Sequence, residues 1–232
     1  MSEHMISVQH LERTYPGKVP TLAVKDISFD VARGEFIAIM GRSGSGKSTL
    51  LHQLSLLDTP TGGSIHIDGA DILALSSAEK TRYRLEHLGY IFQEYALILE
   101  FNALENVYLP AMALGSNVKE YRKRAAELLE IVGLKERLHH YPNELSGGEQ
   151  QRVAIARSLV NSPKVLFADE PCANLDVSSA KNIMELFSRL KHELNQTIVM
   201  VTHEEEDRQY VDRIIRLSDG CIEKIEHPHG DG

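Results

Sequence analysis

The chain has 232 residues, a length typical of one large domain that carries an inserted subdomain. Hydrophobic residues make up 42 % and charged residues 25 %, which excludes disordered, collagen-like and fibrous proteins. The formal net charge of −8 argues against nucleic acid as a partner, because nucleic-acid binders present a basic surface.

No stretch of the sequence predicts a membrane span or export. The most apolar runs, such as Phe36–Met40, are far shorter than the roughly 20 residues that cross a bilayer. The first residues, Met1–Met5, lack the basic start and apolar core of a signal peptide. Cys172 and Cys221 are far apart and form no CxxC pattern. We therefore expect a cytoplasmic chain with free thiols.

The first third of the sequence predicts a β-rich lobe followed by a buried strand and a helix. Residues 6–15 and 21–31 are expected to be strands joined by a turn at Pro16–Gly17. The continuous apolar run Phe36–Met40 is typical of a strand buried on both faces. A helical pattern follows from Lys47 to Leu57.

The rest of the chain alternates between helical and strand patterns, and its middle third is mostly helical. The further strands are predicted at 64–67, 89–93, 165–168, 197–202 and 213–217, and the further helices at 103–114, 118–132, about 150–160 and 178–194. This order predicts an α/β fold.

A glycine-rich motif lies between the predicted strand at 36–40 and the helix that follows it. Its residues match GxxxxGK[ST] and are Gly41, Arg42, Ser43, Gly44, Ser45, Gly46, Lys47 and Ser48. Backbone N–H groups of such a turn point inward and, with the helix N-terminus, bind phosphate. Lys47 is expected to reach the β- and γ-phosphates, and Ser48 to ligate Mg²⁺. The motif predicts a P-loop nucleotide site.

Two acidic residues end the predicted buried strand at 165–168. Asp169 is expected to hold Mg²⁺, directly or through water. The next residue, Glu170, is then placed to polarise the water that attacks the γ-phosphate. By themselves, two acids at a strand end are often only structural, but the phosphate loop favours the functional interpretation.

A second candidate anion site opens the predicted helix at 150–160. Ser146, Gly147 and Gly148 stand in the sequence LSGGE, where a serine and two glycines lead into a helix. One nucleotide does not need two such sites in one chain. This pentapeptide resembles the signature of the ATP-binding cassette (ABC) superfamily.

The ABC resemblance extends over about 6–225 and implies roles for further residues. It implies a head-to-tail homodimer in the ATP-bound state, in which the signature of one copy faces the γ-phosphate held by the other. The residues to which it assigns roles are Tyr15 as the adenine-stacking aromatic, Gln93 of the Q-loop as a catalytic and metal-binding residue, Asp176 in the D-loop 174–176, His203 as the switch histidine and Thr49 as a further nucleotide contact.

The resemblance also implies an architecture. The fold is expected to be that of a P-loop NTPase, with a RecA-like core of mainly parallel sheet, an N-terminal antiparallel β subdomain and an inserted α-helical subdomain. In this interpretation 1–232 is a single ABC ATPase domain. The β subdomain and the core take 1–93 and 163–232, and the helical subdomain with the signature takes 94–162.

Within the superfamily, several segments resemble the branch that contains lipoprotein-releasing, macrolide-efflux and cell-division ATPase subunits. These segments are 57–63, 103–107, 144–159 and the run from Asp169 to Asp176. The resemblance implies an ATP-hydrolysing subunit that binds ATP and Mg²⁺ and docks on separate transmembrane permease subunits at the cytoplasmic face of the membrane. No nucleic acid is expected.

Three other functions would share part of this set of motifs. A soluble ABC-type ATPase acting on DNA or ribosomes would need long coiled coils or a second cassette, which this chain lacks. A P-loop kinase would share Gly41–Ser48 but would not need the LSGGE segment. A regulatory nucleotide binder that does not hydrolyse ATP would not need Glu170 and His203.

Overall fold

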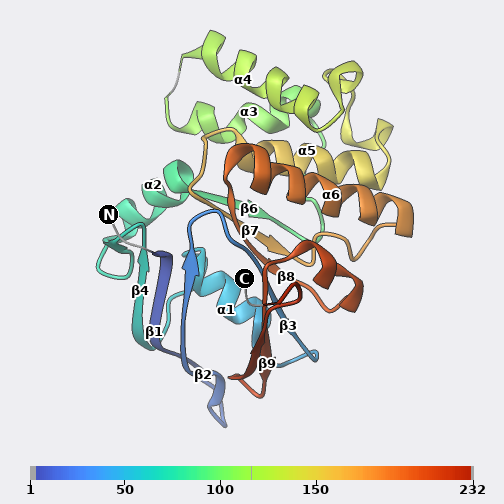
Figure 1. Cartoon of the computed structure of the whole chain (residues 1–232). Helices are drawn as coiled ribbons and strands as arrows, with labels where there is room; N and C mark the ends of the chain where they lie inside the picture. Colours follow the sequence, from blue (N-terminus) through green and yellow to red (C-terminus); the bar gives the residue numbers. More distant parts are fainter. Residues whose placement is uncertain (1–3, 116, 231–232) are drawn as a thin grey trace. The chain divides into compact units, whose positions relative to one another are not determined.

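The computed structural model describes residues 4–115 and 117–230, and the chain divides into two compact units (Figure 1). The first unit consists of residues 1–80 and 188–232. The second unit consists of residues 81–187. Each unit has its own sheet strands and its own buried apolar residues.

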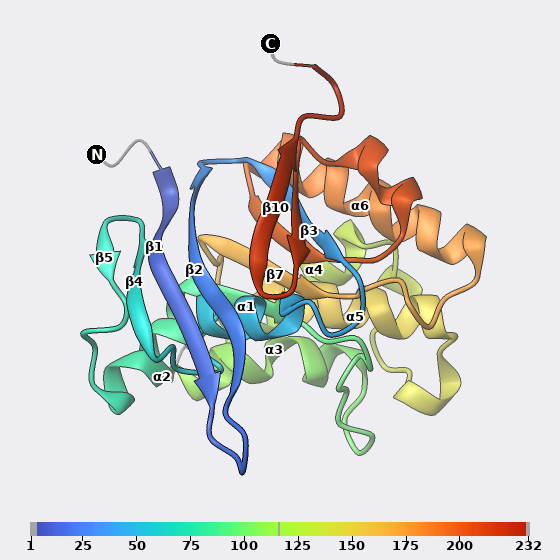
Figure 2. The same ribbon diagram turned by 90° about the horizontal axis from the view of Figure 1, so that it is seen from below.

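An antiparallel sheet opens the first unit, with strand order β2-β1-β4-β5 (Figure 2). Its strands are β1 (His4–Tyr15), β2 (Thr21–Ala32), β4 (Gly62–Ile67) and β5 (Ala70–Asp71). Side chains of β1 such as Ile6, Val8 and Leu11 are buried, as expected where one face of a sheet packs on a core. The predicted β-rich lobe is confirmed.

Parallel strands form the centre of the first unit. β3 (Phe36–Gly41) lies between β8 (Thr197–Val201) and β9 (Arg213–Ser218) and pairs with both in parallel register. Both β3 and β8 are fully buried along their apolar runs, which explains why these sequences show no alternation.

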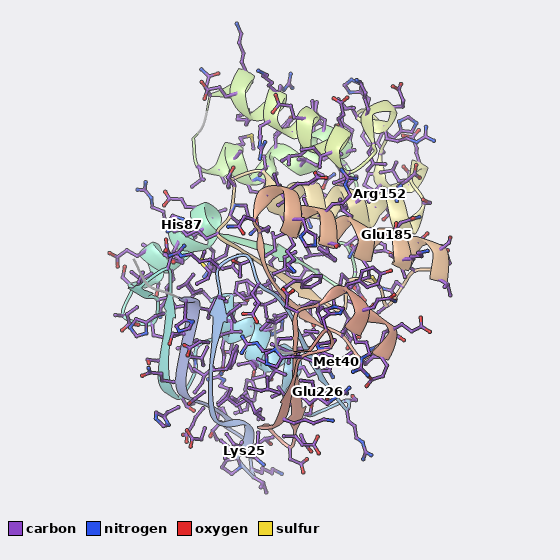
Figure 3. All side chains as sticks on the ribbon, viewed as in Figure 1. Lys25, Met40, His87, Arg152, Glu185 and Glu226 are labelled. Carbon is purple, nitrogen blue, oxygen red and sulfur yellow. The ribbon has the colours of Figure 1, made fainter. Side chains whose placement is uncertain are left out.

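β10 (Cys221–Glu226) adds an antiparallel strand beside β9, and the sequence pattern did not predict it. Its residues are exposed or half-buried, so no apolar pattern marks it. Glu226, labelled in Figure 3, forms an ion pair with Arg216 of β9. Arg216 also makes a two-pronged pair with Glu205, with N–O distances of 2.7 and 2.9 Å.

Two helices before residue 90 differ from the sequence prediction. α1 (Lys47–Leu54) ends before the predicted Leu57, because the chain turns into the left-handed region at Leu56, whose φ is 59°. α2 (Ser77–His87) was missed, because none of its residues is buried and its sequence therefore carries no apolar stripe.

The second unit combines a parallel strand pair with packed helices. β6 (Leu88–Ile91) pairs with β7 (Val165–Asp169). The helices α3 (Ala103–Ala113), α4 (Val118–Ile131) and α5 (Gly147–Leu159) contact one another. α6 (Val177–Leu194) begins in this unit and continues into the first. The mostly helical middle of the chain is therefore as predicted, and the fold is α/β.

Within the described part of the chain, no helix has the length and apolar character needed to cross a membrane. Cys172 and Cys221 are both in the thiol form, as predicted, since neither is part of a disulfide among the described residues.

Candidate nucleotide site

The phosphate loop connects β3 to α1 in the first unit, as the motif predicts. The Lys47 ammonium donates hydrogen bonds to the carbonyl oxygens of Gly41 (3.0 Å) and Arg42 (3.2 Å). The buried hydroxyl of Ser45 has no hydrogen-bond partner among the described residues. A buried donor without a partner is costly, and an oxygen of a bound phosphate would satisfy it. The loop therefore fits an anion.

Two glycines of this loop cannot be replaced by residues with a side chain without a clash. Gly46 has φ 99°, and a Cβ there would lie 2.4 Å from the carbonyl oxygen of Ala23. A Cβ on Gly41 would lie 2.3 Å from the carbonyl oxygen of Leu217. Gly46 is also the N-cap of α1, whose first turn carries no acidic residue. The positive end of this helix dipole is therefore not offset by a carboxylate from its own first turn.

Tyr15 lies at the end of β1 with its ring held from two sides. Its hydroxyl donates to the Asp58 carboxylate at 3.0 Å, and the Arg13 guanidinium lies 4.5 Å from the ring centroid. Arg13 also donates to Asp58 at 2.7 Å. The cation occupies one face of the ring, so a base could stack only on the other face.

His203 follows β8 on a short turn that is fixed by its neighbours. Its Nε2 lies 3.1 Å from a carboxylate oxygen of Glu204, and its side chain is about half exposed. Next to it, the buried Thr202 hydroxyl donates to the Asp207 carboxylate (2.7 Å) and accepts from the Glu204 backbone N–H (3.1 Å). Burial raises the pKa of Asp207 above its usual range, and the nearby Glu204 and Glu206 raise it further.

In the second unit, Asp169 ends β7 as predicted. The Tyr90 hydroxyl on β6 donates to its carboxylate at 3.4 Å. Burial raises the pKa of the Tyr90 phenol, and the negative charge of Asp169 adds to the effect, so this phenol stays protonated. Glu170 follows with φ 44°, a left-handed conformation that is rare for a residue with a side chain. Such strain is frequent at functional sites.

The signature residues form the start of α5. Ser146 caps the helix: its hydroxyl accepts from the Glu149 N–H (3.3 Å), and the Glu149 carboxylate accepts from the Ser146 N–H (2.9 Å). These backbone and side-chain hydrogen bonds, together with Arg137, lower the pKa of Glu149 to about 2. The sequence predicted an anion site here, and the structure places the chain's own carboxylate at this helix terminus.

The predicted Q-loop and D-loop residues meet in the second unit. Gln93 lies two residues beyond β6 and is exposed. Its carbonyl oxygen accepts from the Asn174 side-chain amide at 3.1 Å. Tyr95 donates from its hydroxyl to the Asn174 carbonyl oxygen at 3.4 Å. The contact between these two loops was not predicted.

Asp176 is used as a helix cap in this structure. Its carboxylate accepts from the Ser178 hydroxyl (2.6 Å) and from the N–H groups of Ser178 and Ser179 (3.0 Å each) at the start of α6. These hydrogen bonds hold the pKa of Asp176 well below its usual range.

The site residues fall into two sets, one in each unit. The first unit holds the phosphate loop with Thr49, Tyr15 and His203, and the second holds Gln93, the signature, Asp169, Glu170 and Asp176. The sequence did not single out Tyr90, Asp207, Arg13 or Arg157 as supports of these residues. Arg157, which donates to backbone carbonyls near Gln93, carries one visible signal, a cation within the largely buried helix α5.

Comparisons with known proteins identify the family of this chain. Residues 24–173 match the family model described as ABC transporter. An ABC transporter ATP-binding protein of Methanocaldococcus jannaschii is 49 % identical over 95 % of this chain and 99 % of its own. The lipoprotein-releasing system ATP-binding protein LolD of Cytophaga hutchinsonii is 46 % identical, with the same coverage of both chains.

A solved structure extends the likeness to three dimensions. It is a dimeric ATP-binding cassette in a post-hydrolysis state with ADP and Pi bound, and it is 40 % identical, with a TM-score of 0.90 over 98 % of this chain and 100 % of that chain. With the motifs in their places on the fold, this chain belongs to the ABC transporter family, as an ATP-binding and ATP-hydrolysing subunit.

Proposed function

We propose that two copies of this chain enclose two ATP molecules, with the phosphate loop of one copy facing the signature of the other. The observation that carries this proposal is that two helices of the chain start at glycine-containing turns, α1 in the first unit and α5 in the second, where Ser146 and Glu149 form a capping box. Only the first has a buried hydroxyl, that of Ser45, that a phosphate would satisfy. The similar cassette of known structure is a dimer with ADP and Pi bound, which supports a nucleotide-bound dimer.

At each site, the phosphate loop binds ATP through its backbone. On binding, Lys47 would exchange the carbonyl oxygens of Gly41 and Arg42 for phosphate oxygens, which carry more negative charge. The ring face of Tyr15 not covered by Arg13 would stack on adenine. Arg42, Ser43, Gly44, Gly46 and Thr49 complete the proposed nucleotide contacts.

The donor set proposed for Mg²⁺ suits that ion. Ser48, Gln93 and Asp169 offer hydroxyl, amide and carboxylate oxygens, which are the hard ligands that Mg²⁺ prefers alongside water and phosphate. When bound, the ion would neutralise charge on the phosphates.

Hydrolysis is assigned to Glu170, which follows Asp169 in the sequence, together with His203 and Asp176. Glu170 would accept a proton from the attacking water, a role that needs a carboxylate close to the γ-phosphate. His203 would contact the γ-phosphate and report whether it is present. Asp176 would act across the dimer from its position at the start of α6.

The work done by the dimer is conformational. ATP would close the two copies because it binds the closed state more tightly, and loss of the γ-phosphate would open them. We place the protein at the cytoplasmic face of the membrane, docked on separate permease subunits through the helical subdomain 94–162. The likeness to LolD, which is named as part of a lipoprotein-releasing system, supports this placement.

Light scattering tests the dimer. The Glu170→Gln variant binds ATP but cannot hydrolyse it, so we expect its mass to double when ATP is added, while the parent releases phosphate and stays largely monomeric. Glu223→Gln changes an exposed carboxylate on β10 in the same way and should behave like the parent. A Glu170→Gln variant that stays monomeric at high concentration with ATP would contradict the sandwich.

A further inference from the structure

The Q-loop contains a strained turn at two consecutive residues. Tyr95 (φ 55°) and Ala96 (φ 51°) both adopt the left-handed conformation, although neither is glycine. Each such residue raises the free energy of the folded chain, because its Cβ crowds the backbone. Two in succession persist only if other contacts hold them.

The contact that holds this turn comes from α5. Arg157 donates from Nη1 to the Ala96 carbonyl oxygen (2.5 Å) and from Nη2 to the Tyr95 carbonyl oxygen (2.7 Å). The rigid, planar guanidinium fork holds two neighbouring acceptors at a fixed geometry, which the flexible ammonium of lysine does not impose. In the part of the chain that the structure describes, Arg157 forms no ion pair with a carboxylate.

The same turn connects three of the nucleotide motifs. The Tyr95 hydroxyl donates to the carbonyl oxygen of Asn174 in the D-loop, and the Asn174 amide returns a hydrogen bond to the carbonyl oxygen of Gln93. The Tyr95 hydroxyl also lies 3.0 Å from where a Cβ on the signature residue Gly147 would be. Moving the Tyr95–Ala96 turn would therefore shift groups in all three motifs.

We propose that Arg157 is a positioning residue for ATP hydrolysis: its two-pronged hydrogen bonds hold the strained Tyr95–Ala96 turn, and through Tyr95 and Asn174 they fix the Q-loop, signature and D-loop relative to one another. Arg157 itself does not touch the nucleotide. The proposal rests on the proposed function, since it assigns to Arg157 a part in that same hydrolysis.

The test compares two single variants and their double variant. Arg157→Lys keeps the charge but loses the fork, so we expect kcat for ATP hydrolysis to fall about tenfold while KM for ATP stays within about twofold. Ala96→Gly removes part of the strain that Arg157 offsets, because glycine adopts positive φ freely. The Arg157→Lys/Ala96→Gly double variant should therefore recover most of the lost kcat.

Controls separate this role from general stability. Arg82→Lys makes the same change at an exposed position on α2 and should leave kcat unchanged. A loss of structure alone would lower the fraction of folded protein, so kcat is expressed per folded chain, with the folded fraction of each variant measured by circular dichroism. Phosphate release by the parent is measured first. A parent that hydrolyses no ATP would contradict the proposed function. The role of Arg157 is contradicted separately, when the parent is active and Arg157→Lys leaves kcat unchanged.

Two results would overturn the proposal. One is an Arg157→Lys variant with the kcat of the parent, and the other is a double variant as slow as Arg157→Lys. If Arg157→Lys does not fold, the melting temperature of the Ala96→Gly single variant tests whether the backbone at Ala96 is strained. It should equal or exceed that of the parent, whereas Ala113→Gly at the exposed end of α3 should lower it. If Ala96→Gly lowers the melting temperature as much as Ala113→Gly does, the backbone at Ala96 is not strained and the proposal is wrong.

Discussion

The phosphate loop and the Q-loop segment 93–102 are both irregular backbone that follows a strand of a parallel pair, yet different kinds of contact hold them in place. At Gly41 and Gly46 of the phosphate loop, neighbouring carbonyl oxygens lie where a Cβ would be. The Q-loop segment is held by side chains that reach it from elsewhere, Arg157 and Asn106. The phosphate loop needs positions that carry no side chain, whereas the Q-loop segment needs the side chains of Arg157 and Asn106. Adding a side chain should therefore disrupt the first loop, and removing one should disrupt the second.

The largest effect is expected in the phosphate loop. Gly46→Ala places a Cβ 2.4 Å from the Ala23 carbonyl oxygen at a positive φ, and we expect the free energy of unfolding to fall by about 2–5 kcal/mol. Gly44→Ala is the matched control, because its φ is 78° but nothing lies within 4 Å of its Cβ position. Urea unfolding of both variants measures the difference, and equal losses would show that close approach is not what fixes this loop.

The Q-loop segment should respond instead to the loss of Asn106. This fully buried side chain accepts from the Ile98 N–H (2.8 Å) and donates to the carbonyl oxygens of Ile98, Phe101 and Asn102 (2.8–3.1 Å). Asn106→Ala removes these hydrogen bonds to the loop backbone and leaves a cavity at a buried position, so we expect the free energy of unfolding to fall by about 2–4 kcal/mol. Asn182→Ala on the exposed face of α6 should cost less than about 0.5 kcal/mol.

A second buried amide sharpens the contrast because it has no partners. Neither amide atom of Gln53, fully buried on α1, is hydrogen-bonded to a described residue. Gln53→Leu removes an unsatisfied polar group, and we expect the free energy of unfolding to rise by about 1 kcal/mol. The buried Gln151 amide, by contrast, donates to the Pro171 carbonyl oxygen at 2.6 Å, so Gln151→Leu should lower the free energy of unfolding. Thermal unfolding of both variants measures whether each substitution raises or lowers the free energy of unfolding. A decrease for Gln53→Leu would contradict the prediction and indicate that the Gln53 amide is hydrogen-bonded.

The smallest effect concerns the turn after His203. Because the pKa of Asp207 is raised in the folded state, the folded chain binds a proton more tightly than the unfolded chain. Stability therefore falls as pH rises from the usual aspartate range through the raised value.

The Asp207→Asn variant has an uncharged amide at this position, which does not ionise between pH 4 and 7.5. We expect the free energy of unfolding of this variant to rise relative to that of the parent as pH rises, by up to about 1 kcal/mol at neutral pH. Chemical unfolding at several pH values from 4 to 7.5 tests this prediction, and a pH-independent difference would contradict it.

The same contrast explains what could be predicted from the sequence. The strand β3, the loop at Gly41–Ser48 and helix α1 follow one another along the chain, so local pattern alone predicts them. Strand β10 and helix α2 have few buried residues and therefore little pattern to detect. The contacts of Arg157 and Asn174 with the Q-loop join residues far apart in the sequence, and no local spacing indicates them.

The resemblance assigned residue roles that local chemistry does not supply. Nothing about His203 or Asp176 alone distinguishes them from a surface histidine and a helix cap. The structure in fact uses Asp176 as a cap, so its proposed role across the dimer adds to a structural one.

The most direct test of the account mixes two inactive variants. Lys47→Ala disables the phosphate loop and Ser146→Arg disables the signature, so each alone should release almost no phosphate. In an equal mixture about half of the dimers combine both chains, and each of these has one site with an intact phosphate loop and an intact signature. We predict that phosphate release returns on mixing. A mixture no faster than the sum of the two variants would contradict a site completed by a second copy.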